Sequence, residues 1–180
     1  MESFWSDIRK LPNIITLIRL IFGAPVTIIL YKNGFEYAWL IFLFFAWLDW
    51  LDGKIARRQK SVTSLGMRLD PLADQFLVLP IMWHLAYVSV WTINIPLILT
   101  LREAIMLLMR WTTNKDIPAM WIGKIKMICE YIGVCCLLLG GQFYFYGFFS
   151  FGLAVVFAII SLIIYFFMAV SGHDYENNRA

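Results

Sequence analysis

The sequence predicts an all-α membrane protein in which six helices cross the bilayer. Of its 180 residues, 61% are hydrophobic and only 15% are charged, and the mean hydropathy is +0.74. A soluble domain carries about a quarter charged residues, so this chain falls outside that class. Six apolar stretches, each long enough to cross the hydrocarbon core as a helix, alternate with short polar links. The length indicates one domain over residues 1–180.

Residues 1–12 are expected to form a short amphipathic helix on the membrane surface. Apolar side chains recur there at helical spacing, at Phe4, Trp5, Ile8 and Leu11, with charged residues between them. A frayed tail is the alternative for this segment. At the other end of the chain, residues 171–180 are polar and are expected to form a solvated tail.

The first span is expected over residues 13–31 and carries a polar stripe. Asn13, Thr16 and Arg19 recur at every third residue, which places them on one face of a helix. Arg19 alone would be explained by snorkelling of its charged end to the membrane interface. Three polar groups on one face instead indicate contact with a polar site.

Two pairs of aspartates lie in the next two spans, which are expected over residues 37–58 and 69–90. Asp49 and Asp52 are three residues apart, and Asp70 and Asp74 are four apart, so each pair shares a helix face. The third span begins either at Asp70, as an N-cap before a proline, or nearer Ser64. Asp70 and Asp74 share a helix face whichever of the two starts is correct.

These four carboxylates predict a metal site. An uncompensated charge at membrane depth costs several kcal/mol, so a cation must share the site. Two acidic faces that meet across a helical hairpin form an all-oxygen ligand set, which suits Mg²⁺ or Mn²⁺. Two such ions about 3.5–4 Å apart can hold a diphosphate and stabilise charge on a leaving oxygen. We expect all four aspartates to bind metal, and we expect Asp74, one turn deeper than Asp70, to act also as the base.

The remaining spans are expected over residues 93–112, 122–140 and 143–170. Arginine that faces lipid is costly, so the cations within these spans should point inward, toward anions or acids. Four of them supply charge that a neutral substrate would not need, and we expect them to bind the phosphate of an acceptor: Arg102, Arg110, Lys124 and Lys126. Alternatively, these cations reflect only the excess of positive charge that membrane proteins carry on one side, or they pair with the acids Glu103, Asp116 and Glu130.

The distribution of positive charge predicts the orientation in the membrane. When six spans are threaded, fourteen of the fifteen Lys and Arg residues fall on one side, and only Lys32 falls on the other. Cytoplasmic loops carry the excess of positive charge. Both termini and the aspartates are therefore expected at the cytoplasmic face of the cell (inner) membrane.

The aspartates belong to a longer pattern. Residues 49–74 read DWLDGKIARRQKSVTSLGMRLDPLAD, which resembles the signature of the CDP-alcohol phosphatidyltransferases, Asp-x2-Asp-Gly-x2-Ala-Arg-x8-Gly-x3-Asp-x3-Asp. Every fixed position is filled, by Asp49, Asp52, Gly53, Ala56, Arg57, Gly66, Asp70 and Asp74. From Pro12 to about Glu130, the chain resembles the bacterial branch of this family that makes phosphatidylglycerophosphate.

The resemblance implies an enzyme that transfers a phosphatidyl group from CDP-diacylglycerol to an alcohol and releases CMP. The acceptor hydroxyl would attack the β-phosphorus, with Asp74 as the base. The resemblance also implies a homodimer and a CDP pocket lined by Asp49, Asp52, Gly53, Ala56, Gly66 and Asp70. From the residues themselves, we expect Arg57 to pair with the diphosphate and Asn13 and Thr16 to contact the CDP group. No nucleic-acid partner is expected.

The acceptor implied by the bacterial branch is sn-glycerol 3-phosphate. Three positions depart from that branch: Met127 replaces its usual Thr, Glu130 its usual Gln, and Gln75 its usual Lys. Inositol phosphate, inositol or serine are therefore alternative acceptors. An alternative from another class is a small cation transporter that uses the aspartates as its ion site. Transporters often contain internal repeats, and we find none in this sequence.

Overall fold

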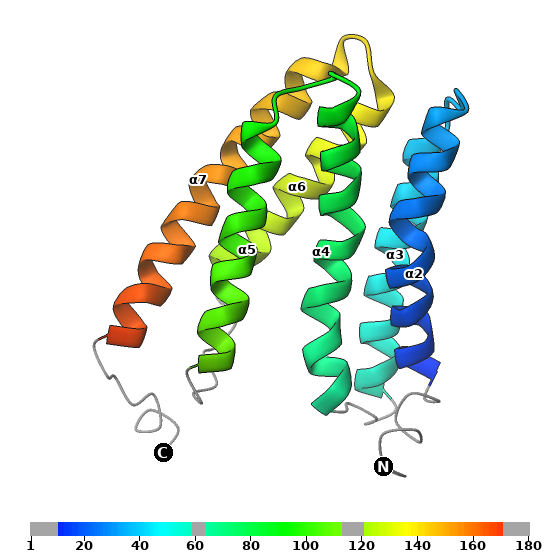
Figure 1. The fold of residues 1–180 in the computed structure, drawn as a ribbon. Coiled ribbons are helices and arrows are strands. Elements are labelled where there is room, and N and C mark those ends of the chain that lie inside the picture. The colour runs from blue at the N-terminus through cyan, green and yellow to red at the C-terminus, as the bar shows by residue number, and fades with distance from the viewer. Residues whose placement is uncertain (1–10, 59–63, 113–120, 171–180) are drawn as a thin grey trace.

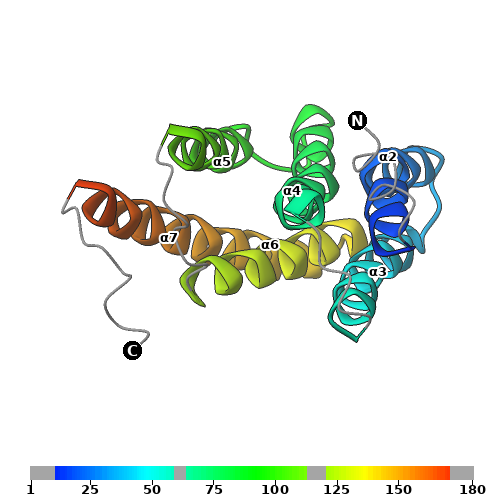
Figure 2. The same cartoon turned by 90° about the horizontal axis from the view of Figure 1, so that it is seen from below.

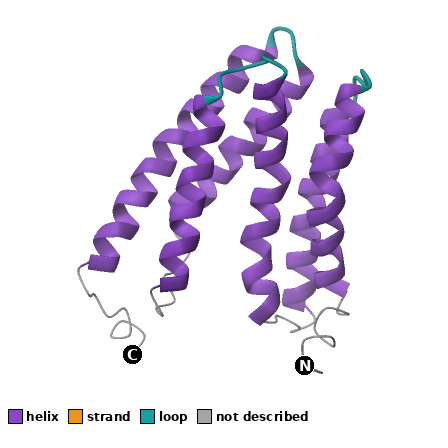
Figure 3. Cartoon of the chain, in the orientation of Figure 1, coloured by secondary structure: helices purple, strands orange, loops and turns teal. Residues whose placement is uncertain are grey.

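The computed structural model describes residues 11–58, 64–112 and 121–170, and this part of the chain is entirely helical (Figures 1 and 3). The helices are α2 (Leu11–Lys32), α3 (Ala38–Arg58), α4 (Ser64–Tyr87), α5 (Asn94–Thr112), α6 (Trp121–Leu139) and α7 (Phe143–Val170). The all-α prediction is confirmed for these residues, and α4 begins at the earlier of its two expected starts. The expected surface helix falls, up to residue 10, outside the described residues, as does the tail 171–180.

The helices run alternately up and down, so that α2 begins and α7 ends at the same end of the bundle (Figure 1). Helix α2 packs against α3 and α4, and α6 packs along α7. Seen from below, α4 and α5 lie on one side of the α6–α7 pair, and α2 and α3 lie beside α4 (Figure 2). The bundle therefore has two parts, which are joined by the packing of α3 and α4 against α6 and of α4 against α5.

Tight turns connect the helices at the opposite end of the bundle. After α2, the Phe35 N–H donates to the Leu30 carbonyl and the Gly34 N–H donates to the Tyr31 carbonyl, both at 3.0 Å. This pair of bonds satisfies carbonyls at the helix end and needs a left-handed residue, which Gly34 supplies with φ 73°. Ser89 takes the same conformation after α4, with φ 62°.

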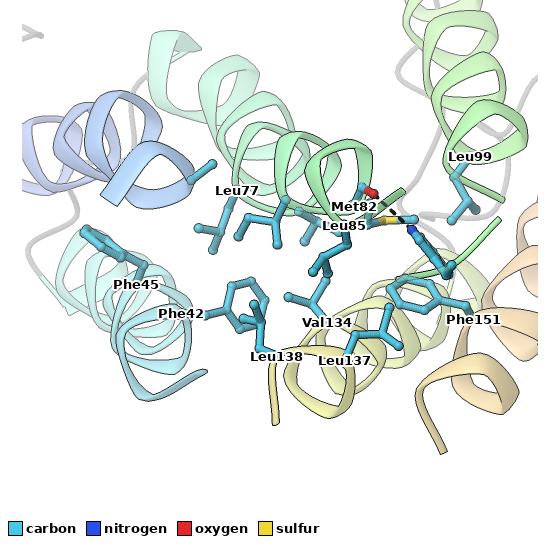
Figure 4. Packing of buried hydrophobic residues seen from close by; sticks show 14 of the residues in the cluster. Phe42, Phe45, Leu77, Met82, Leu85, Leu99, Val134, Leu137, Leu138 and Phe151 are labelled. Atoms are coloured by element: carbon cyan, nitrogen blue, oxygen red, sulfur yellow. Dashed lines mark hydrogen bonds between the residues drawn. The ribbon is translucent and has the colours of Figure 1, made fainter. Parts of the chain in front are cut away.

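The hydrophobic core is centred on α4. Its Leu77, Val78, Ile81, Met82 and Leu85 are at most 1% exposed. Figure 4 shows side chains from the neighbouring helices packed around them, with a hydrogen bond of 3.0 Å from the indole N–H of Trp91 to the Met82 carbonyl.

The outer surface of the bundle is apolar, and polar side chains lie inside. On α2, Thr16, Arg19 and Thr27 are buried, whereas Ile21 and Phe22 are more than half exposed. Helix α7 follows the same pattern, with buried serines and an exposed row of phenylalanines. Within the described residues, two segments are long and apolar enough to cross a membrane, Ile14–Lys32 and Phe143–Phe167. Apolar surfaces around polar interiors indicate a membrane protein.

Candidate active site

The four aspartates of the signature lie on α3 and α4, toward the ends that share one end of the bundle (Figure 1). Asp52 is six residues before the end of α3, and Asp70 is six residues after the start of α4. Asp49 is nine residues from the end of α3, and Asp74 is ten from the start of α4. The two pairs therefore lie at matching distances from the ends of two antiparallel helices.

Asp74 is the one member of this set whose side chain the structure describes. The side chains of Asp49, Asp52 and Asp70, like those of Asn13, Arg57 and the small residues of the signature, fall outside the described part. Among the described side chains, no group of three or more His, Cys, Asp or Glu residues is placed to hold a metal ion. The metal site therefore stays a prediction, which rests on the position of the helices and on the oxygen donors that they carry.

Helix α2 brings a buried cation to Asp74. Arg19 Nη1 lies 3.0 Å from Asp74 Oδ1, and the Arg19 side chain is fully buried, whereas that of Asp74 is 20% exposed. Thr16 is buried on the same face of α2. The prediction that the polar stripe contacts a polar site is thus confirmed for Arg19, and its partner is the expected base.

Close packing of α2 explains how Arg19 reaches Asp74. One turn after Arg19, a Cβ atom on Gly23 would lie 2.8 Å from the Leu77 side chain and 3.6 Å from that of Phe45. The absent side chain lets α2 approach both neighbours. The Thr27 hydroxyl donates to the Gly23 carbonyl at 2.8 Å, which satisfies this buried polar group within the helix.

A second group of charges, which we call the charge cluster, joins α5 and α6 and consists of Arg102, Glu103, Lys126 and Glu130. Lys126 Nζ donates to Glu103 Oε1 at 2.6 Å and lies 3.0 Å from Glu130 Oε1. Arg102 pairs with the same Glu103 oxygen through Nη1 and donates to the Ser161 hydroxyl of α7 at 2.7 Å through Nη2. Lys126 and Glu130 are at most 1% exposed.

The structure thus brings together two of the four cations that were predicted to bind an acceptor phosphate. Arg102 and Lys126 are paired with acids, which is the arrangement given by the alternative interpretation. Lys124 is exposed, and its Nζ lies 5.0 Å from the centre of the Trp121 ring. The side chain of Arg110 and the whole of Asp116 fall outside the described part. Binding of an acceptor phosphate at these residues stays a prediction.

Two contacts in this region could not be found by reading the sequence. Ser161 lies in the most apolar helix, where one serine carries no signal, yet it binds Arg102. Gln75 and Met127, two of the three departures from the bacterial branch, touch each other, with Gln75 Nε2 3.2 Å from Met127 Sδ. Glu130 lies one turn along α6 from Met127. Two of the three departures therefore touch each other, and the third, Glu130, belongs to the charge cluster.

Comparison with known proteins defines the class of enzyme. The family model of the CDP-alcohol phosphatidyltransferases matches residues 9–171. The chain therefore belongs to this family and is a phosphatidyltransferase, which confirms the prediction made from the signature.

Its relatives narrow the comparison further. A protein of Wigglesworthia glossinidia brevipalpis is 30% identical over 172 residues, which cover 89% of this chain and 94% of the relative. A protein of Pectobacterium atrosepticum is 31% identical over 140 residues, 72% of this chain and 76% of the relative. Both are named CDP-diacylglycerol–glycerol-3-phosphate 3-phosphatidyltransferase.

Proposed function

We propose that this enzyme transfers the phosphatidyl group of CDP-diacylglycerol to sn-glycerol 3-phosphate, which gives phosphatidylglycerophosphate and CMP. The observation that carries the proposal is the placement of two aspartate pairs at matching distances from the ends of α3 and α4, with Asp74 held by a buried arginine. The names of the relatives support the choice of acceptor.

Asp74 accepts the proton in the proposed reaction. The acceptor hydroxyl oxygen forms a bond to the β-phosphorus as the bond from that phosphorus to the CMP oxygen breaks. CMP leaves with the electron pair of that bond, and the hydroxyl proton passes to the Asp74 carboxylate. A carboxylate that keeps 20% of its side chain exposed and lies beside a buried cation suits this role.

The donor set fits two divalent ions, Mg²⁺ or Mn²⁺. Asp49, Asp52, Asp70 and Asp74 would hold them, since hard cations of this kind take carboxylate oxygens. When bound, such ions hold a diphosphate and stabilise charge on the leaving oxygen. Around them, the CDP group would lie against the small signature residues Gly53, Ala56 and Gly66. Arg57 and the polar stripe of α2 would contact its polar atoms.

The acceptor phosphate is assigned to Arg102, Arg110, Lys124 and Lys126. Arg110 lies two residues before the end of α5, Lys124 and Lys126 lie in the first two turns of α6, and Arg102 lies near the middle of α5. The end of α5 is at the end of the bundle that carries the aspartates (Figure 1). Since Glu103 and Glu130 already balance Arg102 and Lys126, we assign the larger share of phosphate binding to Arg110.

We place the enzyme in the inner membrane with six spans, and with the active site and both termini on the cytoplasmic side. The two apolar segments of α2 and α7 support this placement. On α5, Leu101, Ile105 and Leu108 are exposed while Arg102 is buried, which is the pattern expected of a span. We also propose a homodimer, following the family, without assigning its interface.

The departures from the bacterial branch at Gln75, Met127 and Glu130, of which the first two touch each other, support a second candidate, the same transfer to inositol phosphate, inositol or serine. A purified sample in detergent micelles, given CDP-diacylglycerol and each acceptor in turn, separates the two. We expect CMP release that depends on Mg²⁺ or Mn²⁺ and on glycerol 3-phosphate, with phosphatidylglycerophosphate as the product. Product from inositol phosphate or serine, and none from glycerol 3-phosphate, would replace our acceptor.

A further inference from the structure

Gln75 of α4 is a half-buried polar residue that the family signature does not include. Its amide nitrogen Nε2 lies 3.2 Å from Met127 Sδ of α6. Its amide oxygen Oε1 is buried and accepts no hydrogen bond from the described part of the chain. One end of this amide therefore meets a thioether, and the other end has no partner within the protein.

This arrangement is costly for the folded protein. A buried amide oxygen without a hydrogen bond loses the water that it binds in the unfolded chain. The contact with Met127 does not compensate for this loss, because sulfur is a weak acceptor and meets only the N–H side of the amide. Leucine at position 75 would fill a similar volume without the cost. A polar group that is kept at a cost in stability points to a role in binding.

The neighbours of Gln75 indicate which substrate it meets. It follows Asp74 on α4, and Asp74 is the proposed base, beside which the reacting hydroxyl must lie. It touches α6 at Met127, which follows Lys126, a residue assigned to the acceptor phosphate. The residues assigned to CDP lie instead on α2, on α3 and in the first two turns of α4. Gln75 therefore belongs with the residues of the acceptor.

The chemistry of Oε1 narrows the choice to one group of the acceptor. An amide oxygen only accepts, so its missing partner is a donor. An ionised phosphate offers acceptors, whereas a hydroxyl offers a proton. Glycerol 3-phosphate carries a terminal hydroxyl, which reacts in the proposed function, and a central hydroxyl, which does not.

We infer, on the basis of the proposed function, that Gln75 is a specificity-determining residue whose Oε1 accepts a hydrogen bond from the central hydroxyl of glycerol 3-phosphate. The contact with Met127 does not prevent this, because an unbranched thioether side chain is flexible and moves as the hydroxyl approaches. Alcohols without a hydroxyl at this place leave Oε1 unpaired and are used less well.

The test pairs a change in the protein with a change in the substrate. 3-Hydroxypropyl phosphate keeps the reacting hydroxyl and the phosphate of glycerol 3-phosphate but lacks the central hydroxyl. The ratio of kcat/KM for glycerol 3-phosphate to that for this analogue, which we call the hydroxyl preference, is measured for the purified protein in detergent. The variants are Gln75→Leu and Gln75→Asn. The controls are Met127→Leu, which removes the sulfur, and Gln142→Leu, at an exposed position before α7.

We expect a hydroxyl preference of about tenfold in wild type, the contribution of one hydrogen bond. In Gln75→Leu the preference should fall to about one, because kcat/KM drops for glycerol 3-phosphate and stays within about twofold for the analogue. Met127→Leu and Gln142→Leu should keep the wild-type preference. Gln75→Leu should also unfold at or above the wild-type thermal midpoint, since it removes a buried acceptor.

A wild-type preference near one would overturn the inference without any variant. A folded Gln75→Leu enzyme that keeps the wild-type preference would also overturn it, and a lower thermal midpoint in that enzyme would show that the amide is structural. If Gln75→Leu does not fold, Gln75→Asn decides. Its amide is one methylene shorter, so the preference should fall to about threefold, and an unchanged preference would contradict the contact.

These outcomes are separate from failure of the proposed function. A wild type that uses glycerol 3-phosphate and the analogue equally well refutes this inference alone. A wild type that releases no CMP with either compound refutes the proposed function.

Discussion

Two groups of charges lie in the described part of the bundle, and they differ in the helices and the charges that they join. The Arg19–Asp74 contact joins a cation of α2 to an acid of α4, and the acid keeps 20% of its side chain exposed. The charge cluster joins two cations and two acids of α5 and α6. Its Glu103 is 19% exposed, about as much as Asp74, whereas Lys126 and Glu130 are at most 1% exposed.

This difference suggests different roles for the two groups. Asp74 belongs to the family signature, and we propose that it serves proton transfer. A cluster in which two cations and two acids balance one another holds helices together, since loss of any member leaves its partners buried and uncompensated. The charge cluster primarily holds α5 and α6 together, with Ser161 extending it to α7.

The largest effect that tests this contrast is expected from Asp74→Asn. The amide preserves the shape of the side chain but cannot accept the proton, so kcat should fall by about 10²–10⁴-fold. Binding of CDP-diacylglycerol, measured by equilibrium binding to the protein in nanodiscs, should change little. A strong loss of lipid binding would show instead that Asp74 acts chiefly as a metal ligand.

In the charge cluster, Glu103→Gln is expected to act mainly on stability. Arg102 and Lys126 lose the carboxylate that they share, although Glu130 still faces Lys126. The cost should be about 3 kcal/mol, seen as a lower thermal midpoint in detergent. Glu36→Gln, at an exposed position in the turn before α3, is the matched control. An unchanged midpoint for Glu103→Gln would show that the cluster does not hold the helices together.

Alanine at selected glycines compares the packing around the two groups. A Cβ on Gly133 of α6 would lie 2.5 Å from the rigid ring of Phe151, so Gly133→Ala should cost about 2 kcal/mol. Gly23→Ala meets the end of a flexible leucine and should cost less. Gly152→Ala, with no atom within 4 Å of its Cβ, should be neutral or stabilising. Thermal unfolding in the opposite order would contradict the packing described here.

The smallest effects are expected at the acceptor cations that do not belong to the charge cluster. Arg110→Ala should raise the KM for glycerol 3-phosphate about tenfold, the loss of one charge-assisted contact, and leave the KM for the lipid nearly unchanged. Lys124→Ala should change either KM by about twofold or less, because this exposed lysine rests on Trp121. Equal changes in both KM values for Arg110→Ala would indicate a structural role for that residue.

The sequence predicted the helices well because apolar length and polar links determine them. It also predicted that Arg19 points inward, since three polar groups at helical spacing are costly against lipid. It named Glu103, Asp116 and Glu130 as possible partners of the acceptor cations but could not choose between them and an acceptor phosphate, because neighbouring residues on a helix do not face each other. The long side chains of Arg102 and Glu103 meet only because Lys126 and Ser161, from two other helices, approach the same place.

The most direct test of the central claim, that acids on α3 and α4 bind a pair of divalent ions, is a Mn²⁺ titration of the purified protein followed by electron paramagnetic resonance. We predict two ions per chain with a spin-coupled signal, and loss of that signal in Asp49→Asn and in Asp70→Asn. A protein that binds no Mn²⁺, or one whose binding is the same in both variants as in wild type, would contradict the account.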